Sequence, residues 1–257
     1  MPLTTLPTAP AEIRRELDAT YSRITHFVEP DATYVRLARA ADAMADLAPA
    51  DSLLMRAQLA AVAGDIPAIR SAVAALAGVP HRAADRLAAS AALARLGLWR
   101  DAQLALAPLL RSDAAALGRA RAQAYAVGLF QRTARESERA EALGHDPGPD
   151  DDASSHGRLA ARILRNADIP DARVLAYLDV IGSVLRQHRR LNEGNVVTAM
   201  EAHPYGMNAV MLEVRVRAGL RSGSLLSDDM YEAYDRHGLP THACLAVWIS
   251  CQLPGLS

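Results

Sequence analysis

Three glycines in the first half of the chain recur at nearly equal spacing, and each interrupts a helical pattern that restarts at once. Gly64, Gly97 and Gly128 are 33 and then 31 residues apart, and each follows an alanine-rich stretch. Glycine ends helices readily because it adopts the left-handed conformation without steric cost. One such turn per period of just over 30 residues is typical of stacked helix pairs. The sequence therefore predicts a helical array.

The composition supports a helical, globular protein. Alanine makes up about a fifth of the 257 residues, and 51% of the chain is apolar while only 4% is aromatic. Alanine is the best helix former, and its small side chain allows helices to approach closely. A chain of this length and apolar content can bury a large core. We expect that core to consist of leucine, valine, isoleucine and alanine.

Helical periodicity places the array in residues 11–143, after a loose segment, residues 1–10, that is rich in threonine and proline. Apolar residues recur with the spacing of one helix face in each predicted element. The predicted helices cover about 11–26, 33–47, 52–63, 67–77, 81–96, 99–110, 113–127 and 130–143.

One segment resembles the tetratricopeptide repeat family. The segment 97–102, Gly-Leu-Trp-Arg-Asp-Ala, is similar to the family's glycine, aromatic and acidic start of the second repeat helix. The segments 64–66 and 128–130 match more loosely, and the resemblance covers roughly residues 50–147. It implies an antiparallel helix-pair array, and it implies that Trp99 is a structural aromatic buried between repeats.

The resemblance also implies a concave groove that binds a protein or peptide. Carried over position by position, the groove-facing candidates are Gln58, Leu87, Arg95, Ala122 and Tyr125. Most of their neighbours are alanine, so we expect the partner to be a helix or an apolar segment. Alternatively, these small residues only allow adjacent repeats to pack.

Residues 144–156 predict a linker, because their glycine, proline, serine and aspartate cannot build a core. We therefore expect the array and the remainder, residues 157–257, to fold separately. The aspartates at 150–152 form a run that could bind a cation, although a solvated loop explains the same composition.

The remainder is predicted to be a small α+β module. Helices are expected at 157–167 and from Pro170 to about 190, and then the apolar period changes to two. Strands are expected at 196–200, 210–217 and 243–249, with a hairpin loop at 204–208 and a helix from Ser227 to His237. The last strand, helix and strand favour a right-handed parallel crossover. The fold class is thus mainly α, with an α+β module of about three strands.

Histidines of the module are the main candidates for chemistry. An acid–base or metal site could use His203, His237 and His242 with Asp228, Asp229, Asp235 and Tyr205. However, no two histidines have the spacing of metal ligands on one helix, and positions at turns and helix ends explain them. We therefore expect no metal site and no catalytic residues.

Other motifs for bound groups are equally weak. The strand residues Glu213, Arg215 and Arg217 could form an anion site, and the loop 219–224 could hold an anion, but a solvated strand face and a flexible connection are simpler explanations. The sequence has no phosphate loop, dinucleotide glycine motif or nucleophile elbow, so we expect no cofactor.

Charge and location narrow the partners. All 28 basic residues are arginine, they are scattered, and the formal net charge is −1, which argues against nucleic acid. The sequence has no run of about 18 apolar residues and no signal-peptide pattern at its start, so we expect a cytoplasmic protein without a membrane span. Cys244 and Cys251 are expected to be reduced thiols.

The expected function is a non-catalytic protein–protein interaction adaptor or scaffold. The array would hold the partner, and the module would supply a second contact surface or the interface of a homodimer. The alternative is an enzyme or a small-molecule-sensing regulatory protein, with its site in the module or between the module and the array.

Overall fold

The protein is mainly helical and ends in a small α+β module, as the sequence predicts. The computed structural model describes residues 10–21, 24–112, 114–145, 152–202 and 207–252. The elements are α1 (Pro10–Tyr21), α2 (Ala32–Ala43), α3 (Pro49–Ala63), α4 (Ile66–Leu76), α5 (Ala83–Arg95), α6 (Trp99–Leu110), α7 (Ala114–Ala126), α8 (Phe130–Ala142), α9 (Asp152–Asn166), α10 (Asp171–Gln187), β1 (Gly194–Ala202), β2 (Met207–Arg217), α11 (Leu220–Arg236) and β3 (Leu245–Gln252).

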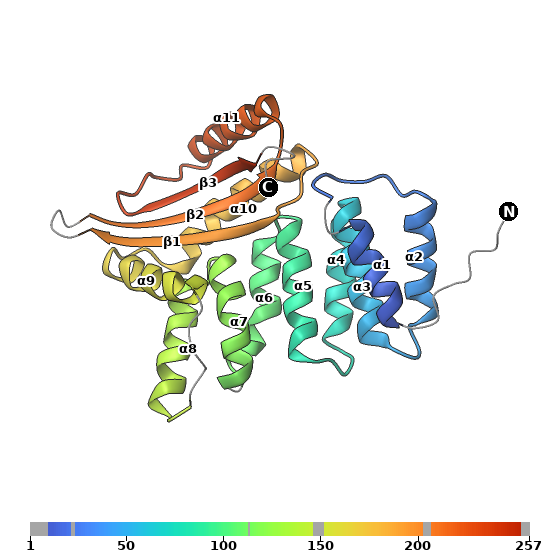
Figure 1. The fold of residues 1–257 in the computed structure, drawn as a ribbon. Coiled ribbons are helices and arrows are strands. Elements are labelled where there is room, and N and C mark those ends of the chain that lie inside the picture. The colour runs from blue at the N-terminus through green and yellow to red at the C-terminus, as the bar shows by residue number, and fades with distance from the viewer. Residues whose placement is uncertain (1–9, 22–23, 113, 146–151, 203–206, 253–257) are drawn as a thin grey trace.

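Antiparallel helix pairs form the array, and the recurring glycines join the helices of each pair. Gly64, Gly97 and Gly128 have φ angles of +74°, +68° and +84°. These left-handed turns connect α3 with α4, α5 with α6, and α7 with α8. Figure 1 shows the helices from α2 to α8 standing side by side, with the sheet across one end of the row. The predicted turns are confirmed, and so are the helices from α3 to α8, but the first helix ends at Tyr21 and not near residue 26, and the second ends at Ala43 and not near residue 47.

The module contains a three-stranded sheet in the order β1-β2-β3. β1 is antiparallel to β2, and β3 is parallel to β2, with α11 as the crossover. Alternate residues of β2 are fully buried, and most of their register partners on β1 and β3 are buried as well. The predicted strand pattern and parallel crossover are confirmed.

Two predicted boundaries are wrong. Helix α9 begins at Asp152, so residues 152–156 belong to a helix and not to the linker. The expected loop 219–224 is the first turn of α11, which begins at Leu220 and not at Ser227. The loose N-terminal segment, the central linker residues and the hairpin tip at 203–206 fall largely outside the described residues.

The array and the module share one core. Helix α10 lies against the turn between α5 and α6, where a Cβ added to Gly182 would be 2.1 Å from the carbonyl oxygen of Gly97. Trp99 is 0% exposed, and its ring lies beside Gly182, which confirms the prediction that Trp99 is buried. Buried residues of both halves belong to one continuous hydrophobic cluster. Because the two halves share this packing, we now expect them to fold as one cooperative unit and not separately.

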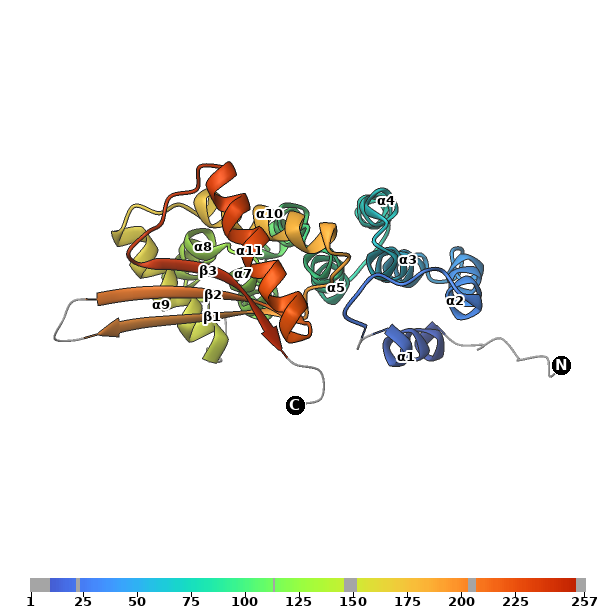
Figure 2. The same ribbon diagram turned by 90° about the horizontal axis from the view of Figure 1, so that it is seen from above.

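The N-terminal helix is also tied to the module. The amide of Phe27 donates to the carbonyl of Arg189, and the amide of Leu191 donates to that of Thr25, both at 2.9 Å. These bonds hold the segment after α1 beside the segment before β1. Figure 2 shows the result, with α1 and the sheet on the same side of the row formed by α3, α5 and α7.

Candidate functional site

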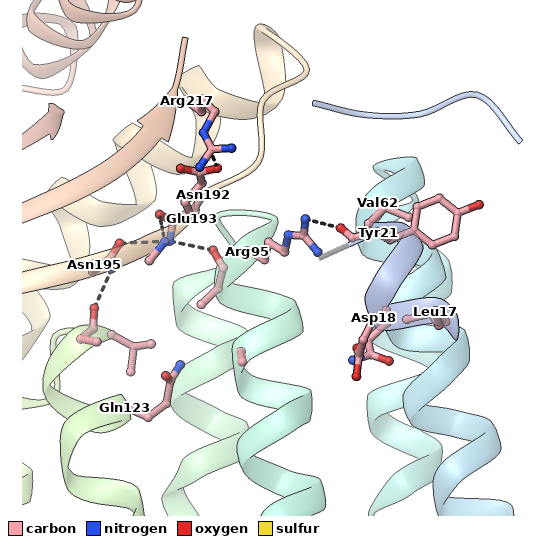
Figure 3. Close-up of a pocket in the computed structure, with 16 residues that line it drawn as sticks. Leu17, Asp18, Tyr21, Val62, Arg95, Gln123, Asn192, Glu193, Asn195 and Arg217 are labelled. Atoms are coloured by element: carbon pink, nitrogen blue, oxygen red, sulfur yellow. Dashed lines mark hydrogen bonds and ion pairs between the residues drawn. The ribbon is translucent and has the colours of Figure 1, made fainter. Parts of the chain in front are cut away.

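A pocket of about 560 Å³ lies between the array and the sheet. Its floor consists of residues of α3, α5 and α7, one wall is α1, and the other wall comprises residues 192–195 with Arg217 of β2. Figure 3 shows Asp18 on the α1 side and Glu193 with Arg217 on the opposite side. Both halves of the chain are therefore needed to form the pocket.

Two asparagines fix the sheet wall by binding the ends of the floor helices. Asn192, 4% exposed, donates from Nδ2 to the Asn195 Oδ1 at 3.0 Å, and its backbone amide donates to the Arg95 carbonyl at 2.8 Å. The Asn195 Nδ2 donates to the Ala126 carbonyl at 2.6 Å. The last carbonyls of a helix have no partner within the helix, so these bonds satisfy groups that would otherwise be unpaired. The start of β1 is thereby locked to α5 and α7.

Arg95 fixes the opposite wall. Its guanidinium donates to the carbonyl of Tyr21 at 2.7 Å and to that of Ile24, at the end of α1. Burial lowers the pKa of Arg95, and the charge of Glu193 opposes that shift. Arg95 is therefore a support of the pocket as well as part of its lining.

The two walls differ in charge pairing. On the sheet side, Glu193 Oε1 lies 3.4 Å from Arg217 Nε. On the α1 side, Asp18 is exposed and makes no ion pair or side-chain hydrogen bond with any described residue. Among the described residues, the Asp18 carboxylate thus has no cationic partner, and it faces a wall whose two charges are paired.

The floor presents two glutamine amides on either side of an alanine. Gln58 of α3 and Gln123 of α7 line the pocket, and Ala91 of α5 lies in the helix between theirs. The Gln58 Oε1 is buried without a hydrogen-bond partner among the described residues, and the Gln123 side chain makes no hydrogen bond with them. An amide offers both donors and an acceptor, so the Gln123 side chain has free hydrogen-bonding capacity, and the shielded Gln58 Oε1 gains it when its amide turns toward the pocket.

The groove candidates from the sequence are only partly brought together. Gln58 and Arg95 line the pocket, whereas Leu87 packs against the core and Ala122 is half-buried outside the lining. The assignment of Tyr125 to the groove is wrong, because it is 1% exposed and its ring centre lies 5.9 Å from that of Phe130.

Sequence reasoning missed most of the polar lining, namely Asp18, Gln123, Asn192, Glu193 and Asn195, and it considered Arg217 only as part of an anion site on the strand. The spacing alone does not identify Gln123. Gln58 and Ala91 each precede their turn glycine by six residues, which points to Ala122, but the structure places Gln123, five residues before Gly128, in the lining.

The histidines of the module do not form a site in the described residues. His203 and Tyr205 lie outside them, His237 caps the end of α11, and His242 packs near Tyr177 with ring centres 6.4 Å apart. The Asp229 carboxylate binds the His188 Nε2 at 2.6 Å, which joins α10 to α11 and was not predicted. No three metal-ligating side chains gather within the described part of the chain.

The remaining candidates do not gather into a site among the described residues. Arg215 and Glu213 pair with each other along β2 at 3.3 Å, Asp152 begins α9, and both cysteines are free thiols. Searched over the same described residues, the chain has no helix of the length and apolarity that a bilayer crossing requires.

Neither a family model, nor a curated protein, nor a solved structure matches this chain significantly.

Proposed function

We propose that this protein is a non-catalytic adaptor that holds an extended segment of a partner protein in the pocket between the array and the sheet. The observation that carries the proposal is the floor, where the amides of Gln58 and Gln123 have no partner within the described residues. The resemblance of the array to tetratricopeptide repeats agrees with such a role.

An extended peptide fits this floor because its backbone needs both donors and acceptors. The N–H and C=O groups of an unpaired peptide must find partners when they leave water. Side-chain amides supply both kinds of group, and Ala91 leaves space between them. Apolar lining from Leu17, Val62 and Val127 would cover the side chains of the segment. This polar floor favours an extended segment over the apolar helix that the sequence suggested.

The module would then act as a wall and not as a separate effector. Its segment 192–195 is bound to the ends of α5 and α7, so the pocket keeps its shape before a partner arrives. A preformed site loses less conformational entropy on binding than one that must first be ordered.

A bulky residue in the floor tests the proposal. Ala91→Trp should fill the pocket, because Ala91 is an exposed floor residue. The control is Ala75→Trp, at an exposed position of α4 outside the pocket lining. Affinity purification from the source cell with mass spectrometry should recover a partner with the unmodified protein and the control, but not with Ala91→Trp. Equal recovery by both variants would contradict the proposal.

A second candidate is a small-molecule-sensing regulatory protein. The specific observation in its favour is that both halves of the chain wall a pocket of about 560 Å³, a volume within the usual range for small-molecule sites. A ligand there would bridge the halves and raise the melting temperature. Thermal-shift screening of small metabolites against the unmodified protein and Ala91→Trp separates this function from the first.

A further inference from the structure

We propose that the occupant of the pocket places a cationic nitrogen group, a guanidinium or an ammonium, beside Asp18. This inference rests on the proposed adaptor function for its main source of the cation, an arginine or lysine side chain of the partner segment. It adds a chemical specificity that the floor amides alone do not give.

The charges of the lining lead to this choice. Four ionised side chains line the pocket, two acidic and two basic. Glu193 and Arg217 pair with each other, and Arg95 donates to the carbonyls at the end of α1. Asp18 is the carboxylate that remains without an ion pair among the described residues.

Two described arginines near α1 are paired with other carboxylates. Arg14, one turn before Asp18, lies 3.2 Å from Asp51, and Arg36 of α2 pairs with Glu16. The acidic residues Asp51 and Glu16 are thus neutralised by neighbours, whereas Asp18 faces the pocket. A bound cation would complete the same pattern of pairing.

The floor amide strengthens the preference for a group with several N–H donors. The Gln58 Oε1 is buried and unpaired among the described residues, so a guanidinium or ammonium beside Asp18 could donate to this second acceptor once the amide turns toward the pocket. An anionic occupant would instead meet the Asp18 carboxylate, which no described residue pairs. The pocket should therefore reject acidic segments, since like charges in a confined site repel.

Selection from a displayed library of random ten-residue peptides tests the inference. The proteins compared are the unmodified chain, Asp18→Asn, and the control Asp46→Asn, which changes an exposed aspartate away from the pocket. Arginine or lysine should be enriched with the unmodified protein and the control, but not with Asp18→Asn. The affinity of the best basic peptide, measured by calorimetry, should fall about tenfold in Asp18→Asn, as expected for a lost charge-assisted hydrogen bond.

The remaining outcomes separate this inference from the proposed function. One outcome overturns the inference and leaves the proposed adaptor function standing. The selected peptides would bind the unmodified protein but not Ala91→Trp, and they would lack basic residues or bind Asp18→Asn equally well. If no peptide is selected but agmatine binds the unmodified protein and not Asp18→Asn, the cation site stands and the adaptor is rejected. Absence of binding by both peptides and agmatine rejects both.

Discussion

Several partly buried polar side chains of this protein bind backbone groups at helix ends. Asn195 donates to the carbonyl of Ala126 at the end of α7, and Arg186 donates to that of Gly97 at 2.6 Å after the end of α5. Asp171 accepts from the amide of Gln131 at 2.9 Å at the start of α8. Helix ends carry the backbone groups that lack partners within the helix. Single side chains therefore set where one helix ends and its neighbour begins.

Asp85 gives a pH-dependent prediction at the start of α5. Burial raises the pKa of Asp85, but hydrogen bonds from the side chain and backbone of Arg82 outweigh burial and the net pKa is lowered. A lowered folded-state pKa means stability that is present above the unfolded pKa and lost as the pH falls through the folded value. Asp85→Ala should lower the free energy of unfolding by about 1–2 kcal/mol at pH 7.

Denaturant unfolding of Asp85→Ala at several pH values checks this. The difference from the unmodified protein should be constant near neutrality and shrink below about pH 4, where the carboxyl becomes protonated. Asp46→Ala, at an exposed position without an ion pair, should show no such dependence. A difference that is independent of pH down to pH 2 would exclude the role of the carboxylate.

Trp99 gives the second prediction at this scale. Its side chain is fully buried between α6 and α10, so Trp99→Ala should cost about 3–5 kcal/mol of unfolding free energy. Trp99→Phe keeps an aromatic ring there and should cost clearly less. A thermal melt unchanged by Trp99→Ala would contradict the packing described above.

At the scale of elements, the contact of α10 with the array depends on two glycines that touch. Gly182 of α10 and Gly97 of the turn allow the backbones to approach. In Gly182→Ala the added Cβ would meet the Gly97 carbonyl at 2.1 Å, and overpacking of this kind costs about 1–3 kcal/mol. That exceeds the gain of about 1 kcal/mol expected for replacing glycine by alanine within a helix.

Chemical denaturation of Gly182→Ala should therefore show a net loss of stability. Gly219→Ala is a control for an uncrowded site, because no atom lies within 4 Å of its added Cβ, and it should cost only the less favourable N-cap residue of α11, about 0.5–1 kcal/mol. A stabilised Gly182→Ala protein would mean that helix propensity outweighs the contact between α10 and the turn.

The array could be predicted from the sequence because its contacts are local. Apolar spacing and turn glycines are read within one helix pair, and the predicted helices agree with α3 to α8 within a few residues. The predicted starts of α9 and α11 were wrong because small residues near each start were interpreted as a linker and a loop. Gly157 instead packs on Tyr125, and Gly223 lies 2.9 Å, measured from its added Cβ, from the Cβ of Cys251.

The pocket could be predicted only in part for the same reason. Gln58 and Arg95 follow the period of the array and were found. The bond between Asn195 and Ala126 joins positions 69 residues apart, and the Arg95 bond to the Tyr21 carbonyl spans 74. Such pairs leave no periodic signal in one sequence, so the residues that form the two walls could be identified only from the structure.

At the scale of the whole molecule, we expect a single unfolding transition. The chain has two tryptophans, Trp99 in the array and Trp248 in β3, and both belong to or pack against the same hydrophobic cluster. Trp248→Phe and Trp99→Phe leave one fluorescent reporter in each half. For each variant, the fluorescence midpoint in urea should coincide with the midpoint followed by circular dichroism, as cooperative two-state unfolding requires.

Separately folding halves would give another result. Trp248 in the Trp99→Phe protein would then change at a urea concentration different from that of the bulk helical signal. Limited proteolysis adds an independent check, since a stable fragment ending between residues 145 and 156 would show that the array survives alone. We expect no such fragment, because α9 and α10 pack on α6, α7 and α8.

The bonds between residues 25–27 and 189–191 have a consequence for synthesis on the ribosome. The hydrogen bond from Phe27 can form only after Arg189 has been synthesised, about 160 residues later. At typical translation rates of about 5–20 residues per second, that delay is roughly 10–30 s. The helix pairs can stack while the chain is still growing, but the pocket has no second wall until the last third of the chain has been made. If the pocket holds a partner segment as we propose, a nascent chain would be unable to bind it until both walls are in place.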